Sequence, residues 1–238
     1  MFEKIKKYLN SPFVFAVVLN AAALLVSVTL FVPFFEENDD AFICMIAEGV
    51  YGAREVHLIY TNVILGSIYK SLYSSFPGIR WHSVLQYVFL FTAFTTLTYV
   101  IQCMRPVRED GQNTGKSFKP NGRTVAALIV LSTFYEVYVS VQYSKTATIV
   151  CAIGYMLLLY GTGIRGRNSQ IGRKGSGITG SALNMVEATG IILLVYGMLL
   201  RDSSFLLASL MMLPVCIYEF LSVVKDRNFL TISKLINN

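Results

Sequence analysis

Runs of apolar residues long enough to cross a membrane dominate the pattern of this chain. About 20 residues of helix cross a hydrocarbon layer of roughly 30 Å. Six segments of about this length lie at residues 13–34, 83–103, 124–141, 146–163, 179–200 and 203–224. No β-barrel alternation is present. The pattern therefore predicts an all-α integral membrane protein, built as a single module over residues 1–238.

The segment 34–82, between the first two spans, begins with a short predicted helix. Asn38 or Asp39 is a good N-cap, and acidic residues favour the positive end of a helix. The helix over 41–48 is too short to span, and two glycines follow it, Gly49 and Gly52. We expect it to lie along the membrane surface with three apolar side chains toward lipid, Phe42, Met45 and Ile46.

A second candidate helix in this segment covers residues 56–76. Its length is enough to cross, and its apolar residues repeat at helical spacing, but serines, Asn62 and Lys70 make the other face polar. If it spanned, the basic residues from Arg105 to Arg123 would move to the other side of the membrane. The sequence therefore predicts a second interfacial or re-entrant helix, closed by Pro77-Gly78.

The basic residues orient the predicted spans. Of 20 lysines and arginines, 15 lie at the amino terminus, in loops at 104–123 and 164–178, and in the carboxy-terminal tail. The excess of positive charge marks the cytoplasmic side, so both termini are expected inside and the acidic segment 34–82 outside. Basic cytoplasmic loops account for the net charge of +6, and nucleic acid is not an expected partner.

The predicted spans also contain ionisable residues, and most of the four cysteines lie within them. The four cysteines are widely separated and match no zinc or disulfide spacing, so buried inert thiols are expected. Three glutamates fall within predicted spans, where a charge is costly and indicates function: Glu136, Glu187 and Glu219. They favour a transporter, although the chain shows no inverted repeat.

Short motifs in the outer segment carry a family resemblance. They are Asn38-Asp39-Asp40, Glu48-Gly49-Val50-Tyr51, 57–62, Leu65-Gly66, Leu72-Tyr73, Pro77 and Trp81, followed later by 141–147 and 197–205. The predicted order of a first span, an outer acidic run and two non-spanning helices resembles the organisation of the GT-C class of membrane glycosyltransferases. The motifs themselves resemble those of GT-C-like proteins of the bacterial cell envelope. The resemblance covers residues 13–215 and corresponds to the amino-terminal module of proteins that are usually longer.

The resemblance implies a role for the acidic pair. GT-C enzymes transfer a sugar from a polyprenyl-phosphate donor to an acceptor at the outer membrane face. An acidic residue of the first outer loop acts as the base or, in some members, helps to hold a divalent metal. Asp40 and Asp39 are thus the expected catalytic residues, with Asp40 preferred; no metal is assigned, and a weak Mg²⁺ or Mn²⁺ site at the same pair is the alternative that some members suggest. The alternative is that these residues only cap the surface helix.

Cationic and aromatic residues of the outer side are the expected substrate-binding groups. Arg201, at the outer end of the fifth span, offers a bidentate fork for the donor phosphate, unless it pairs with Asp202 or only flanks the membrane. The other candidates are Lys145, His57, His82, Arg80 and Trp81, for which an anchor at the membrane interface is the alternative role.

Three functional hypotheses follow. The leading one is a membrane glycosyltransferase acting on an envelope glycan or glycolipid at the extracytoplasmic face of the bacterial cytoplasmic membrane, with the lipid bilayer and a polyprenyl-phosphate sugar as partners. The second is a catalytically silent scaffold or binding subunit with membrane-protein partner subunits. The third is a small transporter or flippase.

Overall fold

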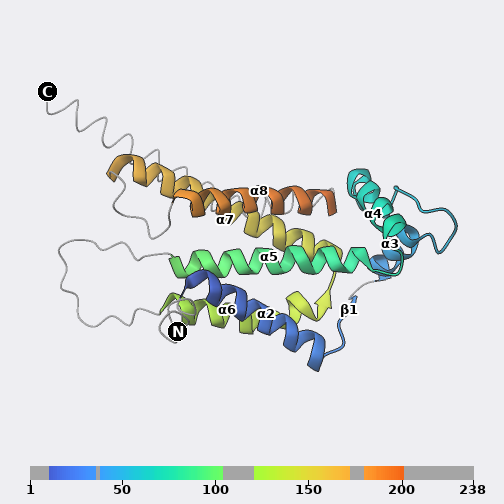
Figure 1. Ribbon diagram of the computed structural model, residues 1–238, viewed down its shortest axis with the longest axis horizontal. Coiled ribbons are helices and arrows are strands. Elements are labelled where there is room, and N and C mark those ends of the chain that lie inside the picture. The colour runs from blue at the N-terminus through green and yellow to red at the C-terminus, as the bar shows by residue number, and fades with distance from the viewer. Residues whose placement is uncertain (1–10, 36–37, 104–120, 172–179, 201–238) are drawn as a thin grey trace.

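The computed structural model describes residues 11–35, 38–103, 121–171 and 180–200, and this part of the chain is almost entirely helical (Figure 1). Its elements, in chain order, are α2 (Pro12–Leu30), β1 (Phe34–Phe35), α3 (Asn38–Glu48), α4 (Val63–Ser75), α5 (Trp81–Cys103), α6 (Gly122–Tyr138), β2 (Ser140–Val141), α7 (Tyr143–Ile171) and α8 (Gly180–Leu200).

Four helices of the described part are long and apolar enough to cross a membrane. They are α2, α5, residues Tyr143–Ile164 of α7 and residues Ser181–Leu200 of α8. The prediction of a helical membrane protein is confirmed in this form. The predicted span at 124–141 corresponds to α6, which has 17 residues and is not among these four, and the predicted span at 203–224 lies outside the described residues.

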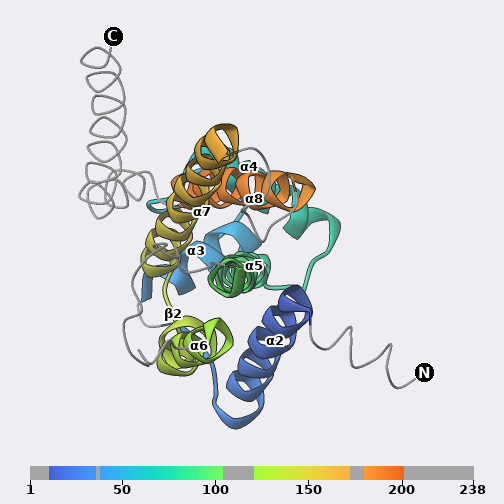
Figure 2. The same cartoon turned by 90° about the vertical axis from the view of Figure 1, so that its left-hand side faces the viewer.

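Helix α5 is the centre of the bundle. Viewed end-on, it is surrounded by α2, α6, α7 and α8, with which it is in contact (Figure 2). A buried polar cluster fixes one side: Asn20 of α2 donates to Thr98 of α5 at 3.1 Å, and the Tyr138 hydroxyl of α6 donates to Asn20 at 3.4 Å. Such interhelical hydrogen bonds fix helix pairs that apolar contacts alone would leave free to slide.

The helices α3 and α4 lie together at one end of the bundle, which we call the α3–α4 end (Figure 1). Helix α5 starts at this end and finishes at the other, whereas α7 starts again at the α3–α4 end. The chain between them therefore has to return along the bundle, and α6 makes that return beside α2 and α5.

Glycines bring α7 and α8 unusually close. A Cβ at Gly154 of α7 would lie 2.8 Å from the backbone oxygen of Gly190 of α8, and the reverse distance is 2.9 Å. The two backbones therefore touch at this point, as small residues allow between membrane helices. Helix α7 also continues to Ile171, so the backbone is helical for several residues of the predicted loop at 164–178.

The segment between α2 and α5 differs in part from expectation. Helix α3 ends before Gly49, whose φ of 83° suits glycine, as predicted. The second helix is shorter than the predicted 56–76: α4 begins only at Val63, where the Asn62 side chain accepts a hydrogen bond from the Ile64 amide at 2.9 Å. Residues 49–62 form turns and loop instead. The spacing of apolar residues alone does not show at which residue an N-cap starts the helix.

Candidate functional site

Asp40 lies where the first turns of three helices meet. It belongs to the first turn of α3, and none of its surface is exposed. The short parallel pairing of β1 with β2, in the register Phe34 to Ser140 and Phe35 to Val141, lies just before α3 and α7. That pairing brings the start of α3 beside the start of α7, although Asp40 and Tyr143 are 103 positions apart.

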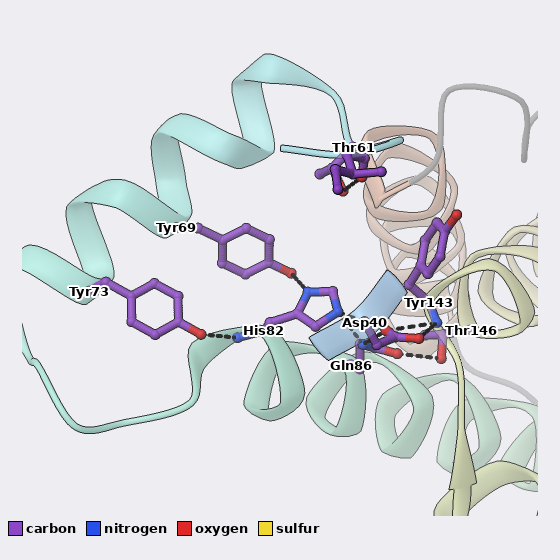
Figure 3. Close-up of polar contacts among 9 residues, drawn as sticks. Asp40, Thr61, Tyr69, Tyr73, His82, Gln86, Tyr143 and Thr146 are labelled. Carbon is purple, nitrogen blue, oxygen red and sulfur yellow. Dashed lines mark hydrogen bonds and ion pairs between the residues drawn. The ribbon is translucent and has the colours of Figure 1, made fainter. Parts of the chain in front are cut away.

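Three donors surround the Asp40 carboxylate (Figure 3). The backbone amide of Tyr143 donates to both oxygens at 3.0 Å, and Nε2 of Gln86 donates to Oδ1 at 3.0 Å. Nε2 of His82 lies 2.8 Å from the same oxygen. Beyond them, Oε1 of Gln86 accepts a hydrogen bond from the Thr146 hydroxyl at 2.9 Å. We call Asp40, Tyr69, His82, Gln86, Tyr143 and Thr146 the Asp40 network.

The Tyr143 contact makes Asp40 the cap of another helix. Tyr143 is the first residue of α7, and the first four amides of a helix have no partner within it. A carboxylate there satisfies one such amide and interacts favourably with the positive end of the helix. Asp40 therefore stabilises α7 from a distant part of the chain.

Tyr69 contacts the other ring nitrogen of His82. Burial raises the pKa of the Tyr69 hydroxyl well above its usual value, so this group stays protonated. The hydroxyl lies 3.2 Å from Nδ1 of His82, and Nε2 of His82 also lies 2.8 Å from Nε2 of Gln86. Both nitrogens of the buried imidazole are therefore in hydrogen-bond contact with protein groups.

Tyr73 caps α5 in the same manner. Its hydroxyl accepts a hydrogen bond from the backbone amide of His82, the second residue of α5, at 3.2 Å. Burial raises the pKa of Tyr73 as well. Side chains of α3 and α4 thus satisfy backbone amides at the starts of α7 and α5, and this fixes the α3–α4 end to the bundle.

Asp39 has the opposite surroundings to Asp40. It is only partly buried, and among the described residues nothing forms a hydrogen bond or ion pair with its side chain. Asp39 is therefore the carboxylate of this pair that a molecule in the surrounding water can contact, whereas Asp40 is enclosed by protein.

The other predicted residues divide into three groups. Lys145, near the start of α7, forms an ion pair with Glu136 at 3.0 Å and donates to the Ser140 hydroxyl at 3.2 Å. His57 and Arg80 are exposed, whereas Trp81 is half-buried and donates through Nε1 to the Phe76 carbonyl at 3.2 Å. Arg201 lies outside the described residues, so its predicted convergence with Asp40 stays a prediction.

Sequence reasoning named Asp40 and His82 on the outer side but did not predict that they meet, and it did not single out Tyr69, Gln86 or Thr146. Gln86 and His82 are four residues apart on α5, a spacing that places both on one helix face. That spacing was the available signal. Tyr143 contributes its backbone amide, which cannot be inferred from the type of its side chain.

A divalent-metal site centred on Asp40 does not fit this geometry. Oδ1 already contacts Gln86 and His82, and the Tyr143 amide donates to both oxygens, whereas a metal ligand needs free oxygen lone pairs. Within the described ranges, no group of three His, Cys, Asp or Glu side chains is arranged to hold a metal.

The fold and the site together define the class of protein as a helical membrane protein with a buried carboxylate network at one end of its bundle. Comparison with protein-family models, with curated proteins and with solved structures found no match.

Proposed function

We propose that this protein is a membrane glycosyltransferase that moves a sugar from a polyprenyl-phosphate donor to an envelope glycan or glycolipid acceptor. Two observations support the proposal. The motifs resemble those of GT-C-like proteins, and two non-spanning helices, α3 and α4, lie between the membrane-length helices α2 and α5 with an acidic pair at the start of α3.

The proposal includes an orientation in the bacterial cytoplasmic membrane. The positive-inside rule puts the basic loops in the cytoplasm and the α3–α4 end outside. Helix α6 then serves as a fifth crossing, because it carries the chain back along the bundle and its 17 residues extend about 26 Å. The sixth crossing at 203–224 remains part of this proposal.

The observation that carries the mechanism is the different burial of the two carboxylates of the acidic pair. Asp39 is accessible and serves as the general base, whereas enclosed Asp40 is the positioning residue that fixes the start of α3. This assignment replaces the sequence-based preference for Asp40, since a base has to come within hydrogen-bond reach of the proton that it removes.

The reaction itself is an ordinary substitution at a sugar carbon. Asp39 accepts the proton of an acceptor hydroxyl, and the acceptor oxygen forms a bond to the anomeric carbon of the donor. The bond from that carbon to the phosphate oxygen breaks, and the polyprenyl phosphate leaves with the electron pair. Expected helpers at this face are the cations Lys145 and Arg80 at the starts of α7 and α5 and, by prediction, Arg201.

Substitution of Asp39 tests the catalytic role. In a strain that depends on the protein, Asp39→Asn is expected to reduce the glycan product about 100-fold or more, the usual contribution of a general base. The product is measured by mass spectrometry of envelope glycans. Asp39→Glu, which keeps a carboxylate, is the matched control and should retain part of the activity. Unchanged product with Asp39→Asn would exclude Asp39 as the base.

A catalytically silent scaffold is the second candidate. It is favoured by the fact that Asp40 is completely occupied as a cap, which a non-catalytic module would need equally. The two functions differ in one outcome: for a scaffold, Asp39→Asn leaves the glycan unchanged, whereas for the transferase it removes most of the product.

A further inference from the structure

A depression separate from the Asp40 carboxylate lies between the C-terminal end of α3 and the start of α5. Its volume is about 390 Å³, within the range of small-molecule sites. The wall includes Glu48, Arg54, Tyr73 and Arg80, together with the turns at Gly49-Val50 and Pro77-Gly78. The lining side chains thus carry two guanidinium groups and one carboxylate.

The arginines are not accounted for by internal contacts. Nε of Arg54 is buried and has no hydrogen-bond partner in the part of the chain that the structure describes. Neither Arg54 nor Arg80 forms an ion pair with a described residue, although Glu48 lines the same depression. A buried donor without a partner is costly, so the described residues do not account for the position of the Arg54 side chain.

Helix ends offer one competing explanation. Cations are favourable beside the C-terminal end of a helix, and α3 ends at Glu48, in the wall of the depression. Arginines that served this purpose would donate to the last carbonyl groups. Among the described residues, no such hydrogen bond is made by Arg54 or Arg80, and the Gly49 turn is instead covered by the aliphatic part of Arg54.

The charges of Glu48 and Arg80 both act on the thiol of Cys44. Burial raises the pKa of the Cys44 thiol to about 12, the Glu48 charge adds to this effect, and the Arg80 charge opposes it. Carboxylate and guanidinium therefore lie within electrostatic range of one thiol while remaining unpaired with each other.

The mixture of groups selects a class of ligand. Guanidinium forks bind carboxylate or phosphate oxygens, and a carboxylate such as Glu48 accepts hydrogen bonds from hydroxyl groups. A molecule that carries both an anionic group and hydroxyls matches this lining. We propose that the depression binds an acidic sugar, held by its carboxylate or phosphate on Arg54 and Arg80 and by a hydroxyl on Glu48.

The position of the depression gives this sugar a role. Glu48 is eight residues after Asp40 on α3, a separation of about 12 Å along the helix. Tyr73 belongs to the wall and also caps α5 beside His82. The acidic sugar is therefore a unit of the acceptor glycan bound at a distance from the reacting hydroxyl, and this assignment rests on the proposed transferase function.

Direct binding measurements test the proposal on the full chain in nanodiscs of phosphatidylcholine. The probes are trigalacturonate and glucose 6-phosphate, with maltotriose as the neutral control, followed by calorimetry or saturation-transfer NMR. At least one acidic probe should bind about tenfold more tightly than maltotriose, the size expected for one charge-assisted hydrogen bond. Equal binding of neutral and acidic probes would overturn the proposal.

Variants locate the binding. Arg54→Gln and Arg80→Gln should each weaken the acidic probe about tenfold. Lys70→Gln, which removes an exposed charge on α4 away from the lining, should leave it unchanged. Arg54→Lys keeps the charge without the fork and should be intermediate. Equal affinity for Arg54→Gln, Arg80→Gln and the unmodified protein would refute the site.

Two further arms separate the possible sources of the anion and the two proposals. If nanodiscs of anionic phosphatidylglycerol abolish probe binding, the occupant is a lipid headgroup and the acidic-sugar proposal fails; undiminished binding supports it. Asp39→Asn should bind the probe normally. Normal probe binding with unchanged glycan product in Asp39→Asn would refute the transferase while leaving the sugar site in place.

Discussion

Asp39 and Asp40 are adjacent in the chain and have opposite environments. The enclosed carboxylate accepts hydrogen bonds from a backbone amide, an amide side chain and an imidazole, whereas the other remains at the surface. Helical geometry explains the difference, because successive residues of a helix point about 100° apart. One residue of such a pair can face the bundle while its neighbour faces water.

Removal of the charge on Asp40 should destabilise the protein. In Asp40→Asn the amide group must face at least one of the donors that the carboxylate accepts from, and a donor is left buried without a partner. We expect a loss of about 3 kcal/mol in the free energy of unfolding. Thermal unfolding in detergent measures it. Asp39→Asn is the matched control and should change stability by less than about 0.5 kcal/mol; equal effects of the two changes would contradict the assigned roles.

At the scale of elements, α4 is held by close contact with the loop that precedes it. A Cβ at Gly66 would collide with the backbone carbonyl of Val56. The Asn62 side chain caps the start of α4, and the backbone amide of Asn62 donates to the backbone carbonyl of Leu199 at 3.0 Å. Because these contacts involve backbone atoms, they cannot relax by rotation of a side chain. The position of Tyr69 and Tyr73, and so the support of His82, depends on them.

A methyl group at Gly66 should therefore displace α4. Gly66→Ala is expected to cost about 1–3 kcal/mol, as overpacking does, and to increase hydrogen exchange in α4 and at the start of α5. Gly163→Ala on α7 is the control, because nothing lies within 4 Å of its added Cβ and alanine is the better helix former. A Gly66→Ala protein as stable as Gly163→Ala would show that the contact with Val56 is not close in solution.

Sequence patterns predicted the elements better than their contacts. Apolar runs located α2, α5, α7 and α8, and the N-cap signal with Gly49 located α3, because these features depend on neighbouring residues. The late start of α4 was missed, since Leu58 continues the apolar spacing without being helical. Within the site, Asp39 and Asp40 were expected, but the donors to Asp40 come from α5 and α7. Their position depends on the pairing of β1 with β2, and strands of two residues are too short to give a recognisable sequence pattern.

For the whole molecule, the decisive feature is that the described helices run back and forth along one axis, with α3 and α4 at one end (Figure 1). Successive long helices run in opposite directions in the order α2, α5, α6, α7 and α8. In the proposed orientation, the acidic pair and the depression, which both lie at the α3–α4 end, share one side of the membrane.

Cysteine labelling can test this orientation. In a variant without native cysteines, Glu55→Cys should react with a membrane-impermeant maleimide in intact cells, because the residue is exposed in the loop before α4. Asn121→Cys, at the N-cap of α6, should react only after the membrane is permeabilised. Labelling of both positions in intact cells would contradict the crossing by α5, the membrane-length helix between them, and the reverse pattern would invert the orientation.

The pairing of β1 with β2 also has a consequence for biosynthesis. The ribosome releases Phe34, Phe35 and Asp40 long before Ser140, Val141 and the Tyr143 amide exist. During that interval Asp40 lacks the partner amide and β1 lacks its partner strand. The amino-terminal half can insert its helices, but the α3–α4 end is completed only when the start of α7 arrives, so its assembly is a late, post-insertion event.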